Sequence, residues 1–296
     1  MSTFEIGTNS AEPLVSIVTP SYNQSEYIED TIQSVANQRY PAIEHVVVDG
    51  KSDDGTVEIL QQYEDQIRWV SEPDEGQADA INKGFDMANG DIVGWLNSDD
   101  VFFVTSVINR VVEYFDTLKT DVIYGDMALL NADSEVLKLQ VTPRFDYEKL
   151  LLGCFIEQPS LFFDRAVLED ERLDTDLQVA IDYEFWLRLA RENEFRHVPD
   201  VLAGDRNHEQ RKILAQRDAL VKESERVRSK YGGPTGSERE RQRKLKLLTS
   251  GVPRAGRAAL RTVSLHSSDP QLAFDGELLS LHQMLRNTAR LNRNLV

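Results

Sequence analysis

Cysteine is almost absent from this chain of 296 residues, in which Cys154 stands alone. A single thiol excludes an intramolecular disulfide and a cysteine-based zinc cage. The chain also lacks any run approaching the roughly 20 apolar residues that cross a bilayer, and its polar N-terminal tail, residues 1–13, lacks the apolar core of a secretory signal. We therefore expect a cytoplasmic protein in which Cys154, flanked by apolar side chains, is a small buried residue.

Positive charge is scarce as well, with 33 Lys and Arg against 50 Asp and Glu and a formal net charge of −17. Such a surface repels a phosphate backbone, which argues against general nucleic-acid binding. The charge is uneven, because residues 237–296 carry 11 basic and 5 acidic side chains, a net +6 that leaves −23 for the rest. An acidic body is therefore followed by a basic extension.

The body alternates between predicted strands and predicted helices. Runs of β-branched and apolar residues predict the strands, and amphipathic spacing predicts the helices. The expected strands are 14–19, 43–48, 67–70, 92–96, 122–124 and 136–141, and the expected helices are 25–37, 53–63, 78–87, 101–117, 182–191 and 212–230. This alternation predicts an α/β fold with a mainly parallel sheet and helices on both faces.

The fourth predicted strand ends in the polar cluster Asn97-Ser98-Asp99-Asp100. The carboxyl ends of parallel strands share one edge of a sheet, where open α/β folds bind their ligands. Carboxylate oxygens at that edge suit a hard divalent cation, and such a cation suits a phosphate-bearing substrate. The same four residues also favour a turn and a helix N-cap, so the motif alone leaves a structural role open.

Two glycine-rich phosphate-binding loops are missing. A dinucleotide-binding fold would place GxGxxG directly after the first strand, where this chain has Pro20-Ser21-Tyr22-Asn23-Gln24. A GxxxxGK[ST] loop is absent too. We therefore expect a cation, not a glycine loop, to bind the phosphates.

Seven motifs occur in order along the chain, at residues 15–23, 46–56, 72–84, 95–100, 158–160, 182–188 and 202–208. Together they resemble those of the family 2 glycosyltransferases, which are nucleotide-sugar-dependent enzymes of the GT-A (Rossmann-like) fold. The resemblance runs from about Val15 to Lys212 and implies the same fold for this chain.

The resemblance, together with a glycine- and proline-rich break in the sequence, suggests a domain organisation. The implied GT-A domain covers 14–231, with a nucleotide-binding half at 14–117 and an acceptor half at 118–231. Gly232-Gly233-Pro234-Thr235-Gly236 then breaks the pattern. Beyond it we expect a basic helical C-terminal extension, residues 237–296.

By this resemblance, Asp99 and Asp100 hold a divalent cation, Mn²⁺ or Mg²⁺, on the nucleotide diphosphate. Asn97 stands where many relatives carry Asp, and its amide, with Ser98 beside it, contacts the nucleotide sugar without adding charge. His208 matches a position where some GT-A enzymes supply another metal or phosphate contact. A structural or simply exposed histidine is the alternative.

The resemblance implies further contacts with the nucleotide sugar: Pro20, Tyr22, Asp49, Gln77, Asp79, Asn82 and Lys83. Tyr22 lies in the loop that flanks the base, and Asp49 recognises the base or the ribose. The alternative for Asp49 is a cap on the next helix. Ile81 stands where many relatives have Arg, so the diphosphate charge is met by Lys83 or by the cation alone.

Asp182 matches the catalytic base of inverting members. The chemistry needs a carboxylate that removes the proton of the attacking hydroxyl as the sugar-phosphate bond breaks. Glu184 is the alternative base. Two residues along a helix are turned by about 200°, so both cannot face one site unless the helix begins between them.

The basic extension has two interpretations. Residues 237–263 carry eight basic and two acidic side chains among several leucines. Such a segment suits peripheral contact with an anionic inner membrane face and a lipid-linked acceptor. It equally suits a solvated helix that packs on the acidic body or on a second subunit.

The expected function is inverting transfer of a sugar from a nucleotide-diphosphate donor to an acceptor hydroxyl, in polysaccharide, glycolipid or glycoprotein glycan assembly. One alternative is a sugar-1-phosphate nucleotidyltransferase, although those enzymes usually carry a Gly-rich, Arg-containing loop after the first strand. The other is a non-catalytic nucleotide-sugar-binding scaffold, which Asn97 and Ile81 keep open and which Asp99, Asp100 and Asp182 together oppose.

Overall fold

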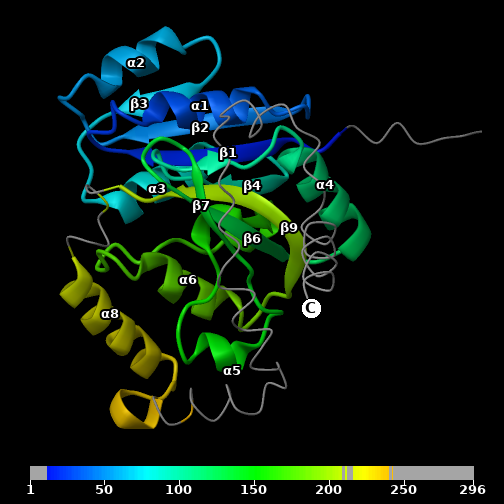
Figure 1. Ribbon diagram of the computed structural model, residues 1–296, viewed down its shortest axis with the longest axis vertical. Coiled ribbons are helices and arrows are strands. Elements are labelled where there is room, and N and C mark those ends of the chain that lie inside the picture. The colour runs from blue at the N-terminus through cyan, green and yellow to red at the C-terminus, as the bar shows by residue number, and fades with distance from the viewer. Residues whose placement is uncertain (1–11, 209–210, 212–215, 240–241, 243–296) are drawn as a thin grey trace, which may run out of the picture.

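A single nine-stranded sheet runs through the described part of the chain (Figure 1). The computed structural model describes residues 12–208, 211, 216–239 and 242. The strands are β1 (Val15–Ser21), β2 (Ile43–Asp49), β3 (Arg68–Ser71), β4 (Ile92–Trp95), β5 (Val101–Phe102), β6 (Val122–Leu130), β7 (Val136–Gln140), β8 (Leu161–Asp164) and β9 (Phe195–Arg206). Their order is β3-β2-β1-β4-β8-β6-β9-β5, with β7 paired to β6.

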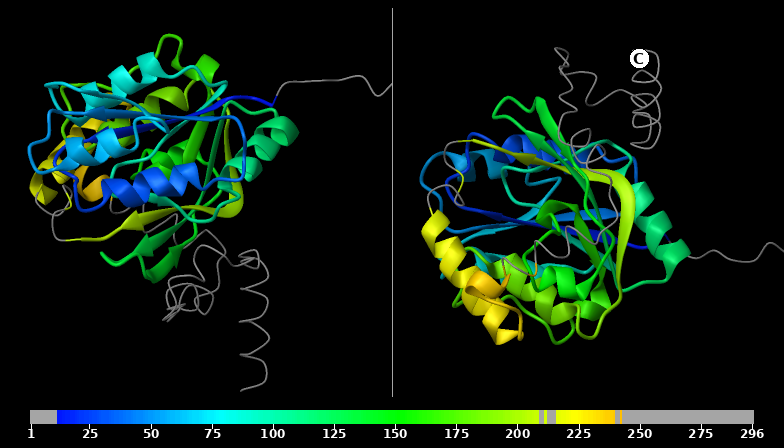
Figure 2. Two further views of the ribbon diagram at one scale, coloured as in Figure 1. Left: turned by 90° about the horizontal axis from the view of Figure 1, so that it is seen from above. Right: turned by 60° about the horizontal axis from the view of Figure 1, so that its bottom comes forward.

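Helices cover both faces of this sheet. One core layer lies under α1 (Ile28–Ala36), α2 (Thr56–Gln62) and α4 (Val107–Leu118). The other lies under α3 (Gln77–Met87) and α6 (Ile181–Leu189), and α8 (Arg217–Lys230) packs against α6 (Figures 1 and 2). Shorter turns are α5 (Tyr147–Leu150), η1 (Gln158–Ser160) and η2 (Arg165–Leu168).

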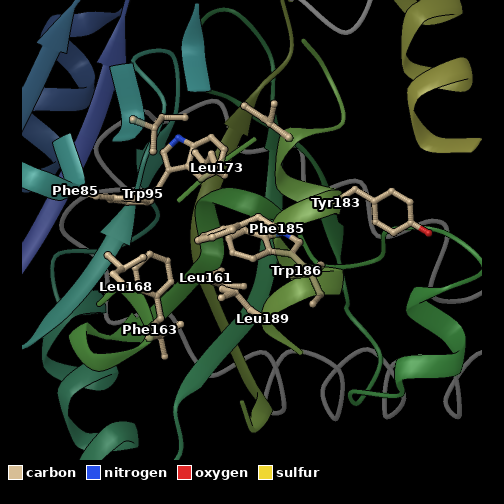
Figure 3. Close-up of a cluster of buried hydrophobic side chains, with 14 of the residues drawn as sticks. Phe85, Trp95, Leu161, Phe163, Leu168, Leu173, Tyr183, Phe185, Trp186 and Leu189 are labelled. Carbon is tan, nitrogen blue, oxygen red and sulfur yellow. The ribbon is translucent and has the colours of Figure 1, made fainter. Parts of the chain in front are cut away.

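Aromatic side chains fill the core beneath α6 (Figure 3). Phe185 and Trp186 are fully buried, and their rings lie 5.5 Å apart. Trp186 also approaches Trp95 of β4 at 6.4 Å, and Phe185 meets Phe163 of β8 edge-on. Buried rings of this size dominate the energy of a core, so the helix that begins next to Asp182 is fixed to the sheet from below.

The predicted α/β class with helices on both faces is confirmed. Parallel pairing holds from β3 to β4 and again between β6 and β9, whereas β5, β7 and β8 pair antiparallel, so the sheet is mixed. The helix expected at 101–117 begins only at Val107, because residues 101–102 form β5. Strands β8 and β9 were not expected, since both lack a clear alternating pattern.

The pairing of β5 with β9 positions the acidic turn. Val101 and Phe102 lie opposite Gly204 and Ala203. These residues are separated by about a hundred positions in sequence, yet the pairing places the turn before β5 beside the end of β9. The polar ends of the two strands therefore meet at one edge.

Several predictions lie outside the described residues. Of the basic extension only residues 237–239 and 242 are described, so the roles expected for 237–263 stay predictions. The same holds for residues 1–11 of the N-terminal tail. Within the described ranges, every helix is too short or too polar to pass through a bilayer.

Gly84 sets the closest approach of α3 to the sheet. A Cβ atom added there would overlap Cγ1 of Val18 on β1 and lie 3.5 Å from Cγ2 of Val48 on β2. On an open helix face, alanine is favoured over glycine by about 1 kcal/mol. Whether Gly84→Ala raises or lowers the free energy of unfolding therefore tells whether α3 packs this closely on the sheet.

We expect Gly84→Ala to lower the free energy of unfolding by about 1–3 kcal/mol, the usual cost of overpacking. In a Val18→Ala background the added methyl has room, and the substitution should cost much less. Denaturant titration of both single variants and the double variant measures this coupling. Stabilisation by Gly84→Ala in the otherwise native chain would contradict the packing.

Candidate active site

Asp99 and His208 form the centre of the polar edge. Nε2 of His208 lies 2.9 Å from Oδ2 of Asp99, and the imidazole is buried with 7% of the residue exposed. The ring packs on Tyr27 with 4.5 Å between centroids. Nδ1 of His208 has no hydrogen-bond partner among the described residues. Of the three predicted metal ligands, the structure thus brings Asp99 and His208 into direct contact.

Asp100, the third predicted ligand, is turned into the protein. Its Oδ1 accepts a hydrogen bond from the backbone N–H of Arg206 at 3.2 Å, and only 3% of the residue is exposed. Burial, reinforced by the charges of Asp99 and Asp205, raises the pKa of Asp100 well above its ordinary value. Burial also raises the pKa of Asp205, although its salt bridge to Arg211 opposes the shift. Ser98, between the site residues, is buried as well.

Arg206 ties this turn to the rest of the fold. Its guanidinium is 2% exposed and donates to the backbone O of Asp99 at 3.0 Å and to Oδ2 of Asp30 at 2.9 Å. It also lies over the ring of Tyr27 and bonds to Ser134 Oγ at 2.8 Å. A buried arginine needs partners of this kind, so one side chain joins α1, the acidic turn and the loop after β6.

The amide of Asn97 uses all four of its hydrogen-bonding positions. Oδ1 accepts from Nε1 of Trp95 at 2.9 Å and from Nε2 of Gln77 at 3.0 Å. Nδ2 donates to Oε1 of Gln158 at 2.8 Å and to Oδ2 of Asp100 at 3.3 Å. An indole only donates and a carboxylate only accepts, so the surroundings require an amide here. The residue that departs from the family pattern thus joins β4, α3 and η1.

An exposed aromatic ring stands at the ends of β1 and β2. Pro20 is buried in register with Val48, and Tyr22 projects beyond it with 63% of its surface exposed. A Cβ on Gly50 would lie 2.6 Å from Oδ2 of Asp74 and 3.3 Å from the Tyr22 ring. Three loops therefore meet beside a ring that can stack on a nucleotide base.

Asp49 is fully buried and holds the loop after β2. Its carboxylate accepts hydrogen bonds from the backbone N–H of Ser52 at 2.9 Å and from the hydroxyl of Ser71 at 2.7 Å. The alternative role as a helix cap is wrong, because α2 begins at Thr56 and Asp54 accepts the hydrogen bond from the N–H of that residue.

The other predicted donor-side residues on α3 are held by protein partners. Lys83 contacts Glu72 at 3.0 Å and Asp79 at 3.3 Å, and the hydrogen bond that it donates to Glu72 raises the pKa of this ammonium. Asn82 makes two hydrogen bonds to the backbone of Leu173, at 2.9 and 3.0 Å. Gln77 alone of these side chains reaches the acidic turn, through Asn97.

Asp182 and Glu184 face different surroundings. Asp182 is partly exposed in the first turn of α6, and burial among neighbouring groups raises the pKa of its carboxyl to about 6. Glu184 is fully buried and binds Lys230 Nζ at 2.8 Å, the Tyr231 hydroxyl at 2.5 Å and Arg188 Nη2 at 3.1 Å. The structure therefore leaves Asp182 as the carboxylate available to a substrate.

Glu157 directly precedes η1, whose Gln158 bonds to Asn97 of the acidic turn. Burial raises the pKa of its carboxyl to about 7, and the charges of both Asp205 and Asp182 add to the shift. The expectation of a buried Cys154 is wrong, because the residue is exposed, although its thiol donates to the backbone O of Ile156 at 3.5 Å.

Sequence reasoning missed Arg206, Asp205, Glu157 and Gln158 as site residues. Three of them lie inside the motifs at 158–160 and 202–208, and Glu157 directly precedes one. Their position in or beside a motif could have identified them as site residues. Their side-chain types could not, since Arg and Gln at such positions suit a solvated loop equally well.

The donor set fits a hard divalent cation. Among the described residues, no three His, Cys, Asp or Glu side chains already converge as a complete metal site. Such cations are commonly held by one or two carboxylates together with substrate phosphates. A site of this incomplete type is consistent with the carboxylate of Asp99 beside the imidazole of His208, whose Nδ1 atom is unpartnered among the described residues.

Comparison with known proteins adds the family. Residues 16–167, about half of the chain, match the model described as glycosyl transferase family 2. The chain belongs to this family. The matched segment includes the acidic turn and Gln158, and it ends before Asp182 and His208.

Named relatives of this family 2 glycosyltransferase come from several bacteria. An uncharacterized glycosyltransferase of Rickettsia typhi is 28% identical over 215 residues, covering 68% of this chain and 66% of that protein. The Bacillus subtilis protein TuaG, whose name assigns it provisionally to teichuronic acid biosynthesis, is 50% identical over 93 residues, 30% of this chain and 37% of its own. Escherichia coli chondroitin synthase is 27% identical over 66% of this chain and 29% of that protein. The chain thus spans about one to two thirds of the length of these relatives.

Solved structures support the GT-A fold for this glycosyltransferase. Residues 1–349 of Staphylococcus aureus TarS, in complex with UDP-GlcNAc, superpose with a TM-score of 0.62 at 19% identity, covering 76% of this chain and 68% of that chain. The mannosyltransferase PcManGT of Pyrobaculum calidifontis, in complex with GDP-Man and Mn²⁺, gives 0.60 at 18% identity, covering 85% and 79%. The predicted GT-A fold and family are confirmed.

We expect Asn97→Asp to destabilise this protein by about 1–3 kcal/mol at pH 8, the cost of leaving buried polar groups unpaired. The new carboxylate would face Asp100 and could donate to neither Asp100 nor Gln158. Its pKa would be raised in the folded state, so the penalty should shrink as the pH falls and the carboxyl binds a proton.

Urea titration at pH 8 and pH 5 measures this effect. Asn37→Asp, at an exposed position after α1, is the matched control and should change stability little. Equal stabilities of Asn97→Asp and the wild type at pH 8 would show that the amide is not required.

Proposed function

We propose that this protein transfers a sugar from a nucleotide-diphosphate donor to an acceptor hydroxyl with inversion at the anomeric carbon. One arrangement carries the proposal: Asn97 of the acidic turn bonds to Gln77 of α3, and the adjacent Gly76 lies beside Gln178, so the segment that leads to Asp182 adjoins the turn that holds the Asp99–His208 pair. A donor diphosphate and an acceptor hydroxyl need groups of these two kinds on opposite sides of the reacting carbon.

The donor side is assigned from the ends of β1, β2 and β4. Tyr22 is exposed where it can stack on the base, beside Asp49 and the loop that contains Asp74. Asp99 and His208 would hold a divalent cation, Mn²⁺ or Mg²⁺, with Asp100 behind them. When bound, such a cation neutralises the charge that builds on the departing diphosphate.

Asp182 is assigned as the base. In the proposed step the acceptor oxygen forms a bond to the anomeric carbon, and the carbon–oxygen bond to the diphosphate breaks with its electron pair going to the diphosphate. Asp182 takes the proton of the acceptor hydroxyl. A carboxyl with a pKa of about 6 is ionised at neutral pH and is a stronger base than an ordinary aspartate.

The substrate class follows by analogy with neighbours. TarS and PcManGT are described with UDP-GlcNAc and with GDP-Man and Mn²⁺, and the names of TuaG and chondroitin synthase refer to polysaccharides. We therefore propose a UDP- or GDP-linked sugar as donor and a glycan or lipid-linked glycan as acceptor. Contact of residues 237–263 with a membrane remains part of this proposal.

We expect one of UDP, GDP and dTDP to bind in a Mn²⁺-dependent manner. Asp99→Ala combined with His208→Ala should weaken that binding by at least about tenfold, since the cation loses both protein ligands in contact. Isothermal titration with and without Mn²⁺ measures this. Asp116→Ala, an exposed aspartate at the end of α4 paired with Lys119, should bind as the wild type does. Absence of nucleotide binding by the folded wild type would overturn the assignment of the donor site.

We expect Asp182→Asn to lower kcat by about 10²–10⁴-fold, the usual contribution of a general base, without changing nucleotide affinity. The base must be deprotonated, so the wild-type rate should rise with pH through about 6 and level off above it. Release of nucleoside diphosphate from the donor, followed between pH 4.5 and 8.5, measures both effects.

Glu184→Gln is the control for this experiment. It weakens the ion pairs with Lys230 and Arg188, so it should lower the melting temperature and leave the pH dependence unchanged. A pH midpoint that moves in Glu184→Gln, or a rate that survives Asp182→Asn, would overturn the assignment of Asp182.

A further inference from the structure

The segment that leads into α6 is held at both of its ends. At its start, Asn82 of α3 makes two hydrogen bonds to the backbone of Leu173. At its end, the backbone N–H groups of Gln178, Val179 and Ala180 all point at one carboxylate, that of Glu223. Asp182 follows two residues later, in the first turn of α6.

Glu223 is bound as an anion by a row of backbone donors. Its Oε2 accepts from Val179 at 2.9 Å, from Ala180 at 3.0 Å and from Gln178 at 3.2 Å, and Oε1 accepts from Gln178 at 3.1 Å. Successive backbone N–H groups at the start of a helix form an anion-binding site, which the helix dipole strengthens. A charged acceptor is therefore favoured here over a neutral one.

The helix that supplies Glu223 is itself fixed to α6. Lys230, at the end of α8, binds the buried Glu184 of α6 and lies 3.7 Å from Asp174. The hydroxyl of Tyr231 contacts Glu184 as well. Figures 1 and 2 show α8 beside α6, so α8 supports the helix whose first turn carries Asp182.

The same segment touches the donor side. A Cβ on Gly76, the residue before α3, would lie 3.9 Å from Oε1 of Gln178. Gln77 follows and bonds to Asn97 of the acidic turn. The segment held by Glu223 thus lies beside Gly76, which precedes Gln77 of the donor side, and continues directly into Asp182.

We propose that Glu223 is a positioning residue for sugar transfer: its carboxylate fixes the start of α6 and thereby the place of Asp182 relative to the donor. This inference rests on the proposed function of Asp182. Glu223 acts only through the backbone of residues 178–180 and touches no reacting atom. A misplaced base slows the chemical step far more than it weakens donor binding.

The test compares Glu223→Gln with Glu225→Gln, an exposed glutamate two residues along the same helix. Nucleoside diphosphate release is measured with the donor that the titrations identify, and hydrogen exchange is followed at residues 178–183. We expect Glu223→Gln to lower kcat by roughly tenfold or more, with the donor KM and nucleotide affinity within about twofold of wild type. Exchange at 178–180 should rise, and Glu223→Asp should recover part of kcat because it keeps the charge.

The outcomes separate the possibilities. Unchanged kcat in Glu223→Gln, or equal losses in Glu223→Gln and Glu225→Gln, overturns the proposal. A loss of kcat that only follows a parallel loss of nucleotide affinity and melting temperature also overturns it, since that is a purely structural effect. If the wild type releases no nucleotide from any donor, the proposed function fails. Unchanged hydrogen exchange at residues 178–180 in Glu223→Gln would independently refute the anchoring of this segment by Glu223.

Discussion

The buried guanidinium of Arg206 is the constraint on which the site depends. A charge that is 2% exposed must be satisfied on every side, and here the partners come from α1, the acidic turn and the loop after β6. Removing the Arg206 side chain would leave the backbone oxygens of Asp99 and Ala132 without this donor, and unpaired polar groups are costly in a protein interior. The acidic turn between β4 and β5 is therefore held to the end of β9 by one side chain as well as by the pairing of β5 with β9.

In and near the candidate site the protein also concentrates acidic side chains, at a cost in stability. Asp100, Asp205, Glu157 and Asp182 all have raised pKa values, chiefly because burial disfavours their charged forms. Such strain is typical of functional sites, where groups are arranged for a ligand instead of for the empty fold. Asn97 fits this logic, since a neutral amide at the first motif position avoids one more carboxylate next to Asp100 and joins α3 to η1.

Motif order predicted the fold and the family, and the structure places Asp99 beside His208, two residues whose expected role as metal ligands stays a prediction. Local sequence pattern did not predict the features that depend on contacts between distant parts of the chain. The helix expected from 101 begins at 107 because two residues pair with β9. The choice between Asp182 and Glu184 depends on α8, because Lys230 at its end forms an ion pair with Glu184. The role of Asn82 as a backbone anchor also depends on a segment ninety positions away.

The sequence by itself determined the alternation of strands and helices, because periodic apolar burial is a local property that each segment carries. It also determined one polar edge of the sheet, because Asp49 and the cluster from Asn97 to Asp100 each directly follow a predicted strand. Only the tertiary structure decided which of those polar groups remain available to a ligand. Arg206, Asn97 and Glu223 find their partners across large separations in sequence, and hydrogen bonds of this kind depend on positions that no local pattern specifies.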